Sequence, residues 1–109
     1  MYARVTQYHV QPEKYDEFIA ALHSAVPLMR QQAGFHALLV LRVEGSKPPD
    51  VRVMTIWESQ QALQQSESNL YFYQAVARAM VLSQGFPTIR EEEVVLHDFP
   101  RISTSAAGA

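Results

Sequence analysis

A nearly continuous apolar run, FHALLVLRVE at Phe35 to Glu44, constrains the fold of this chain more than any other feature. Its β-branched and apolar content between turn signals predicts a strand. Within it, Leu38 to Leu41 leave neither face of the strand polar, so we expect both faces to be buried. The run is far shorter than the ~20 apolar residues of a membrane span. We therefore expect a core strand of a globular protein, with no membrane as a partner.

Patterns on either side of this run predict the other elements. The first strand reads YARVTQYHV, the third reads VRVMTIWE after a Gly/Pro-rich turn, and both helical segments carry apolar residues at helical spacing. Pro27 lies inside the first helical pattern, where we expect it to kink the helix or end its regular part near Val26. Ser59 is a natural N-cap for the second helical segment, which has a predicted break at 66–69. The predicted strands are 2–10, 35–44, 51–58 and 89–96, and the predicted helical segments are 12–33 and 60–84.

The resulting order, β-α-β-β-α-β, is that of the ferredoxin-like α+β unit, a four-stranded antiparallel sheet with both helices on one face. A length of 109 residues fits one domain. We expect a single domain over 1–100 and a C-terminal tail of small residues over 101–109. The helices leave the other sheet face without cover, whereas Leu38 to Leu41 predict burial on both faces. A second copy of the chain is the simplest cover, so we expect a homodimer.

Charge and cysteine content exclude several function classes. Nine Lys and Arg against eleven Asp and Glu give a net charge of -2, which argues against a nucleic-acid partner. The absence of cysteine excludes disulfides, Cys-ligated zinc, iron–sulfur clusters and a thiol nucleophile. Arg4, Gln7 and His9 interrupt any apolar signal segment at the N-terminus. We therefore expect a cytoplasmic location.

No common cofactor motif is present: there is no nucleophile elbow, phosphate loop, G-x-G-x-x-G or H-E-x-x-H. In the acidic run Glu91 to Glu93, the first and third residues share one strand face and the second opposes them, so the run predicts a solvated strand start and no metal cage. The histidines are too dispersed to indicate a metal site by spacing. They are His9, His23, His36 and His97. We expect that the protein uses no metal, flavin or other cofactor.

Aromatic and hydrogen-bonding side chains are the remaining candidates for chemistry. Trp57 stands where a strand passes to a helix, Tyr71 follows on that helix, and Tyr8 lies on the first strand. One interpretation is that Trp57 caps the core while the tyrosine hydroxyls reach the surface. The alternative is a cleft between sheet and helices in which an aromatic ligand stacks and is hydrogen-bonded. The candidate catalytic residues are Trp57, Tyr8 and His9, and the candidate substrate pocket comprises Thr6, Tyr8, Trp57, Tyr71, Phe72 and Val76.

The sequence does not decide which face of the first strand points to the helices, because both faces mix polar and apolar residues. If the odd-numbered face does so, His9 and Gln7 enter the pocket. If the even-numbered face does so, Tyr8, Thr6 and Arg4 enter it.

Four segments together resemble the antibiotic-biosynthesis-monooxygenase family of the dimeric α+β-barrel superfamily: YHVQPEKYDEFIAAL, AGFHALLVLR, VMTIWESQQAL and EEEVVLHDF. The likeness extends over about residues 2 to 98, and Trp57 matches the family's strand-end tryptophan. The resemblance implies a homodimer whose sheets face each other as a barrel, with a pocket between each sheet and its own helices. It also implies oxidation of electron-rich phenols, quinols or anthrones by molecular oxygen without metal or flavin.

The heme-degrading branch of the superfamily is similar in the same tryptophan segment, but it uses a first-strand asparagine, a second tryptophan and an axial histidine. Here the corresponding positions carry Thr6 or Gln7, Ser66 and Val76, so heme degradation is disfavoured. The hypothesis is therefore a cofactor-independent monooxygenase that oxidises a small aromatic, quinol or polyketide-like substrate with O2. The alternative is a non-catalytic small-molecule-binding or stress-related protein of the same fold.

Overall fold

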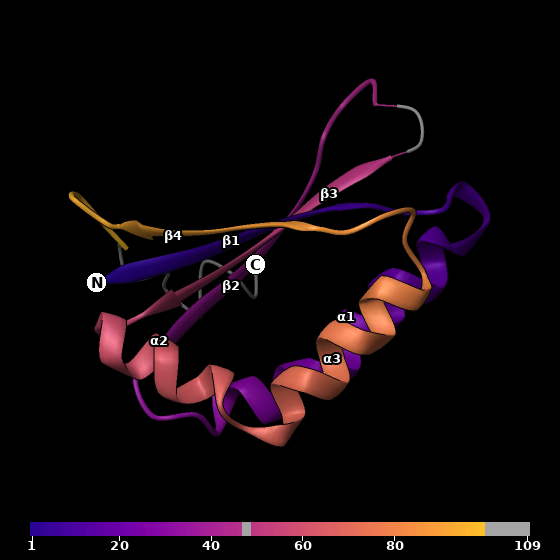
Figure 1. Ribbon diagram of the computed structural model, residues 1–109. Coiled ribbons are helices and arrows are strands. Elements are labelled where there is room, and N and C mark those ends of the chain that lie inside the picture. Colours follow the sequence, from indigo (N-terminus) through magenta and orange to yellow (C-terminus); the bar gives the residue numbers. More distant parts are fainter. Residues whose placement is uncertain (47–48, 100–109) are drawn as a thin grey trace, which may run out of the picture.

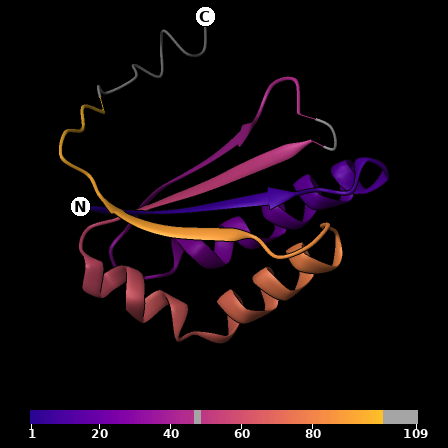
Figure 2. The same ribbon diagram turned by 45° about the horizontal axis from the view of Figure 1, so that its top comes forward.

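The computed structural model describes residues 1–46 and 49–99, and it shows a four-stranded antiparallel sheet with the helices on one of its faces (Figure 1). The strand order is β2-β3-β1-β4. The view in Figure 2 shows the same two layers, with the opposite sheet face uncovered within the described chain. The elements are β1 (Tyr2–His9), the 3-10 turn η1 (Pro12–Lys14), α1 (Tyr15–Arg30), β2 (Phe35–Arg42), β3 (Asp50–Trp57), α2 (Gln60–Glu67), α3 (Leu70–Val81) and β4 (Thr88–Glu93). The predicted ferredoxin-like α+β fold is confirmed.

The predicted elements are all present, but the last strand is shorter than predicted. β4 ends at Glu93 rather than at Leu96, because Glu93 pairs with Tyr2, the first residue of β1, and no residue of β1 remains to pair beyond it. The predicted break in the second helical segment is confirmed between α2 and α3. The tail expected at 101–109 and part of the turn after β2 lie outside the described residues.

Pro27 does not end the first helix, which corrects one of the two outcomes expected from the sequence. α1 continues to Arg30 with Pro27 inside it, and a kink at Pro27 stays a prediction. A proline removes the hydrogen bond to the carbonyl four residues earlier, here that of His23. Both residues lie on the exposed side of α1, so water can satisfy that carbonyl, while buried Ala25 and Met29 hold the last turns against the rest of the protein.

The core lies between α1, α3 and the centre of the sheet. Phe18 of α1 is fully buried. Its ring packs edge to face against the ring of Tyr8, with the two ring centroids 5.2 Å apart. The buried cluster consists of Tyr8, Val10, Phe18, Val51, Val53, Ala79 and Leu82. Because β1 contributes Tyr8 to this cluster, the alternation of strand side chains directs the other even-numbered residues of β1 toward the helices as well.

The apolar run of β2 is not buried on both faces within one chain. Leu38 packs partly against the core, whereas Leu39 is 47% exposed and Leu41 is 44% exposed. Leu39 is paired with Met54 on the sheet face that carries no helix. That face therefore presents leucines to its surroundings, and its cover by a second copy stays a prediction.

We expect Gly34→Ala to destabilise the protein more than Gly45→Ala does. Both glycines have a positive φ, which costs an alanine about 1–2 kcal/mol. At Gly34 an added Cβ would also lie 2.6 Å from Cβ of Ala62 on α2, whereas nothing lies within 4 Å at Gly45. Overpacking adds about 1–3 kcal/mol. Urea unfolding of both variants measures the difference, and equal losses would show that α2 yields freely.

Candidate functional site

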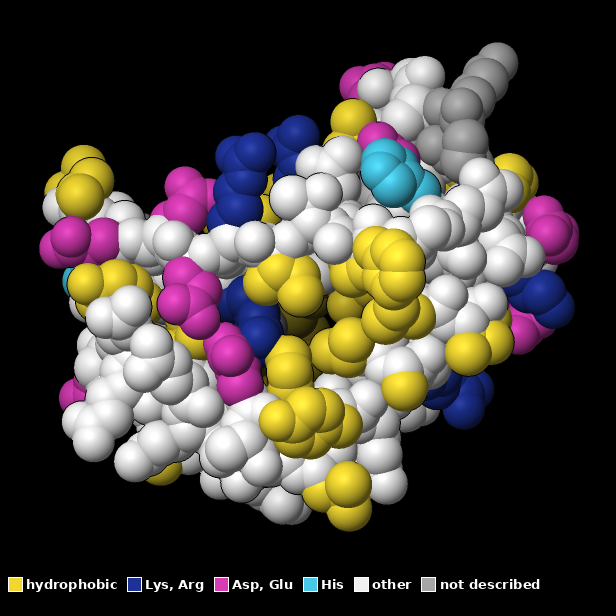
Figure 3. Space-filling model, in the orientation of Figure 1, with side chains coloured by type: hydrophobic (Ala, Val, Ile, Leu, Met, Phe, Trp, Pro, Cys, Tyr) yellow, Lys and Arg dark blue, Asp and Glu magenta, His cyan; other side chains and the backbone are white. Residues whose placement is uncertain are grey.

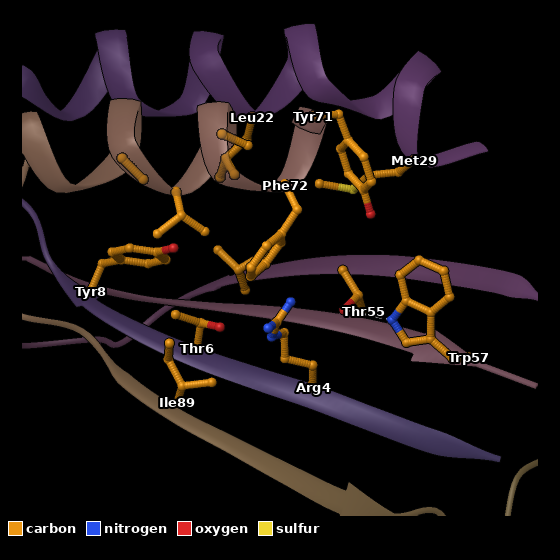
Figure 4. A pocket seen from close by; sticks show the side chains of 14 residues that line it. Arg4, Thr6, Tyr8, Leu22, Met29, Thr55, Trp57, Tyr71, Phe72 and Ile89 are labelled. Carbon is orange, nitrogen blue, oxygen red and sulfur yellow. Dashed lines mark hydrogen bonds between the residues drawn. The ribbon is translucent and has the colours of Figure 1, made fainter. Parts of the chain in front are cut away.

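A partly open cavity of about 60 Å³ lies between the sheet and the helices (Figure 4). Its walls are mainly apolar, and its polar side chains rise from β1 and β3. The lining residues are Arg4, Thr6, Tyr8, Leu22, Met29, Val53, Thr55, Trp57, Tyr71, Phe72, Ala75, Val76, Ala79 and Ile89. The even-numbered face of β1 therefore faces the helices, which decides the question left open by the sequence.

The structure brings the six residues of the predicted pocket together at this cavity: Thr6, Tyr8, Trp57, Tyr71, Phe72 and Val76. His9, a candidate catalytic residue, is not among its lining residues. It is an odd-numbered residue of β1, so its side chain points to the opposite sheet face, where 47% of it is exposed and its Nδ1 lies 2.6 Å from Oδ1 of Asp50. His9 is thus corrected to a surface position paired with β3.

Trp57 is 2% exposed and forms one end of the cavity. Its ring contacts Phe35 edge to face at 5.3 Å, so the tryptophan both packs in the core and lines the cavity. An indole N–H at the edge of a cavity could donate a hydrogen bond to a ligand. In the structure this N–H donates instead to Oγ1 of Thr55, 3.0 Å away on the same strand. Trp57 therefore offers the cavity an apolar ring, while the hydroxyl of Thr55 supplies the polar group.

The most polar side chain of the cavity is Arg4, which is 8% exposed. Its guanidinium points into the cavity beneath Phe72, whose ring centroid lies 4.0 Å from Cζ (Figure 4). Nη2 of Arg4 lies 2.9 Å from Oε1 of Glu67, the last residue of α2. Glu91 of β4 is paired with Arg4 in the sheet register. The guanidinium of Arg4 therefore has two acidic neighbours beside the cavity, Glu67 and Glu91.

Sequence reasoning did not single out Glu67, because it lies in a polar stretch of α2 with no motif around it. Arg4 entered only as a residue of one possible face of β1. The register that places Glu91 beside Arg4 depends on pairing between the two ends of the chain, which local patterns do not reveal. The available signal was the predicted helix break at 66–69, which includes Glu67 at the end of α2.

Burial alters the titration of the groups around Arg4. Burial raises the pKa of the Glu67 carboxyl above its ordinary value, the charge of Arg4 lowers it, and a hydrogen bond to Glu91 raises it further. Burial also raises the pKa values of Tyr8 and Tyr71. Both tyrosines are therefore neutral at pH 7 and can act as hydrogen-bond donors. The site combines neutral phenol donors, one guanidinium and a carboxylate with increased basicity.

The cavity is smaller than an aromatic ligand requires. An engineered protein cavity that binds benzene has a volume of ~150 Å³, compared with about 60 Å³ here. Ile89 of β4 is 49% exposed, and Tyr71 and Phe72 of α3 are only half-buried, so none of these three lining side chains is fixed by complete burial. Figure 3 shows the opening as a hollow with hydrophobic walls and with basic and acidic side chains at one edge. An aromatic ring would therefore fit only after lining side chains move outward.

Among the residues that the structure describes, no three His, Asp or Glu side chains are grouped so as to hold a metal ion. No helix of the described chain has the length and apolar character needed to cross a bilayer.

The family model for antibiotic biosynthesis monooxygenases matches residues 1–78. The chain belongs to this family. No curated protein matches it at a significant level. Solved structures support the same fold for the whole sheet-and-helix unit of this family member. A candidate antibiotic biosynthesis monooxygenase from Caulobacter crescentus CB15 has a TM-score of 0.77 at 22% identity, covering 87% of this chain and 90% of that one.

Two further solved structures are similar to this member of the antibiotic biosynthesis monooxygenase family. A conserved protein from Methanosarcina mazei Go1 has a TM-score of 0.75 at 18% identity, over 84% of this chain and 91% of that one. A single-site mutant of SnoaB, a cofactor-independent oxygenase from Streptomyces nogalater, has a TM-score of 0.75 at 15% identity, over 88% and 94% respectively. At these identities the likeness establishes the fold alone.

Proposed function

We propose that the chain is a cofactor-independent monooxygenase that oxidises a small electron-rich aromatic, quinol or polyketide-like molecule with O2 and works as a homodimer. The observation that carries the proposal is the convergence of Arg4, Thr6 and Tyr8 into an apolar cavity walled by aromatic rings. Family membership supports the reaction type, and SnoaB is a structural relative described as a cofactor-independent oxygenase.

The proposed chemistry uses the substrate as the reductant. Removal of a proton from an acidic phenol, quinol or ring methylene makes the molecule electron-rich enough to reduce O2. For a methylene group, CH2 and O2 become C=O and H2O, so one oxygen atom enters the product and the substrate supplies all four electrons. The protein excludes water, orients the ring and stabilises the anion. In this scheme Trp57 forms an apolar wall and Tyr8 donates a hydrogen bond to a substrate oxygen.

A specific observation favours the second candidate, a non-catalytic binding protein of the same fold. The indole N–H of Trp57 is already bonded to Thr55, and the void is small. A site that only binds a ligand needs an apolar wall and a few fixed polar groups, which are present. The two functions differ in whether a bound aromatic consumes oxygen.

The test is a titration of hydroquinones and anthrones that follows the fluorescence of Trp57, the chain's single tryptophan, together with an oxygen electrode. We expect at least one compound to quench the fluorescence and to consume oxygen in step with product. We expect Tyr8→Phe to reduce kcat/KM by about two- to twelvefold, since a lost hydrogen bond costs about 0.5–1.5 kcal/mol. Tyr73→Phe is the matched control, because Tyr73 is 60% exposed on α3.

Three outcomes separate the candidates. Oxygen uptake that depends on Tyr8 supports the monooxygenase. Quenching without oxygen uptake supports the binding protein instead. If no compound in the panel alters the fluorescence, the cavity does not take aromatic molecules and both candidates fail.

A further inference from the structure

Two side-chain atoms next to the cavity are buried without a hydrogen-bond partner among the residues that the structure describes: Nε of Arg4 and Oε1 of Glu67. Oε1 lies 2.9 Å from Nη2 of the same guanidinium, but the contact lacks the direction of a hydrogen bond. The ion pair therefore leaves one donor and one acceptor without a hydrogen bond. Buried polar groups in this state are destabilising, and a ligand that satisfied both would recover that free energy.

The chemistry of the two unused atoms limits what fits them. Nε needs an acceptor and Oε1 needs a donor, and they belong to two side chains in contact. A hydroxyl group meets both needs, since its oxygen accepts while its hydrogen is donated. An ether or a ketone could accept from Arg4 but would give nothing to Glu67. The ring of Phe72, 4.0 Å above the guanidinium, shows that an aromatic ring can stack at this place.

We propose that the Arg4–Glu67 pair is the recognition site for an aromatic hydroxyl, with Glu67 taking the phenolic proton and Arg4 holding the resulting phenolate. This inference rests on the proposed function, because it specifies the substrate class and the base of the same cavity. The ring of the ligand takes the place of the Phe72 ring over Arg4. Glu67 is then a catalytic residue, because it touches the reacting hydroxyl.

The proton transfer is balanced within the site. The phenolic O–H bond breaks, its electron pair stays on the phenol oxygen, and the proton forms an O–H bond with Oε1 of Glu67. Arg4 exchanges one anionic partner, the Glu67 carboxylate, for another, the phenolate, so the complex gains no net charge. The neutral carboxyl of Glu67 can donate to Glu91, its neighbour on β4.

The surroundings of Arg4 favour this exchange. The groups that face it are Glu67 at the end of α2, Glu91 on β4, Tyr8 on β1 and Tyr71 on α3. Burial and Glu91 raise the pKa of Glu67, so its carboxylate accepts a proton more readily than one on the surface does. Arg4 stays charged at all working pH values and stabilises the anion that forms. The two tyrosines add neutral hydroxyl groups without adding charge.

The probe is 4-nitrophenol, whose phenolate absorbs at longer wavelength than the neutral phenol. At a pH below its pKa in water, we expect the protein to bind it as the phenolate, with the pKa of the bound phenol about one to three pH units lower, as an adjacent opposite charge produces. Its methyl ether, 4-nitroanisole, has the same ring and acceptor but no proton to give. We expect it to bind at least tenfold more weakly.

Variants separate the roles of the two residues. In Glu67→Gln the amide cannot take the proton, so binding of the phenolate should release the proton to the solution, whereas the wild-type protein and the matched change Glu93→Gln on β4 should bind it without such release. Arg4→Met combined with Glu67→Gln removes both partners, so that no lone buried charge threatens folding. This double variant should lose the preference for 4-nitrophenol over 4-nitroanisole.

The inference is overturned if 4-nitrophenol binds in its neutral form, if it binds no better than the ether, or if the wild-type protein and Glu67→Gln release the same number of protons on binding it. These outcomes leave the proposed function standing when hydroquinones or anthrones still consume oxygen. Failure of 4-nitrophenol to bind also overturns the inference, and the oxygen measurement then decides separately whether the proposed function fails with it.

Discussion

A Phe18→Ala variant is expected to lose about 3–5 kcal/mol of unfolding free energy, which is the usual cost of removing a buried phenyl ring. Phe18 is fully buried at the centre of the core and supports Tyr8 by an edge-to-face contact at 5.2 Å. The free energy of unfolding of a natural protein is only about 5–15 kcal/mol in total. The variant should therefore be partly unfolded at temperatures where the parent protein is folded.

Urea unfolding followed by Trp57 fluorescence measures this loss. We expect the midpoint to fall while the slope with denaturant stays constant, because the surface exposed on unfolding changes little. Phe86→Ala is the control, since Phe86 is 83% exposed and its loss should change stability by less than about 0.5 kcal/mol. A loss below about 1 kcal/mol in Phe18→Ala would contradict the packing described for this core.

The same phenyl ring connects stability to the site. Tyr8 is 5% exposed, and its side chain belongs to the core cluster and also lines the cavity. An aromatic pair of this geometry contributes about 0.5–1.5 kcal/mol beyond its burial. Removal of Phe18 takes away the surface that fixes the Tyr8 ring, so the hydroxyl should also be less well placed for a ligand.

The periodicities of the sequence were sufficient for the fold, because each element satisfies its own local pattern. Helix α1 follows a stripe that includes Phe18 and Met29, and the break before α3 follows from the polar stretch around Ser68 and Asn69. Pro27 was misleading since local rules do not reveal that its side of the helix is exposed. The end of β4 depended on where β1 begins, which is a property of the pairing and not of the strand itself.

The candidate site could be predicted only as far as face alternation and chain order allow. Trp57 ends a strand and Tyr71 lies on a helix that follows it in the chain, and both residues line the cavity. The sequence did not exclude His9 from the pocket, because both faces of β1 mix polar and apolar residues. The structure places His9 beside Asp50 on the other face. The contact of Arg4 with Glu67 joins the first strand to the end of α2, and no local pattern connects positions so far apart in the chain.

We expect the wild-type protein to be a dimer and Leu39→Glu to abolish that dimer. Leu39 is 47% exposed in the single chain and lies opposite Met54 on the sheet face without helices. Val40 has the other orientation and lines a groove against α1 with Leu38. Leu39, and not its neighbour Val40, is therefore the residue that would face a partner sheet.

The physical reason is the cost of an unpaired charge in an apolar interface. A buried charge without a partner costs about 3–5 kcal/mol, and a symmetric dimer would contain two. The outer face carries the apolar side chains of Met54 and Leu41, and the basic side chains of Arg52 and Arg90 line the same groove as these two residues. In a dimer, each glutamate would be buried where the parent protein has a leucine.

Sedimentation equilibrium at micromolar concentration decides this prediction. The parent protein should have twice the chain mass of 12.3 kDa, and Leu39→Glu should have the single mass or aggregate through its exposed sheet. Leu70→Glu is the matched control, because Leu70 is 69% exposed at the start of α3, in the helix layer away from this face. A parent protein that sediments at 12.3 kDa would exclude the dimer. A Leu39→Glu variant that remains dimeric would place the interface elsewhere. In either case the leucines of β2 would need another cover.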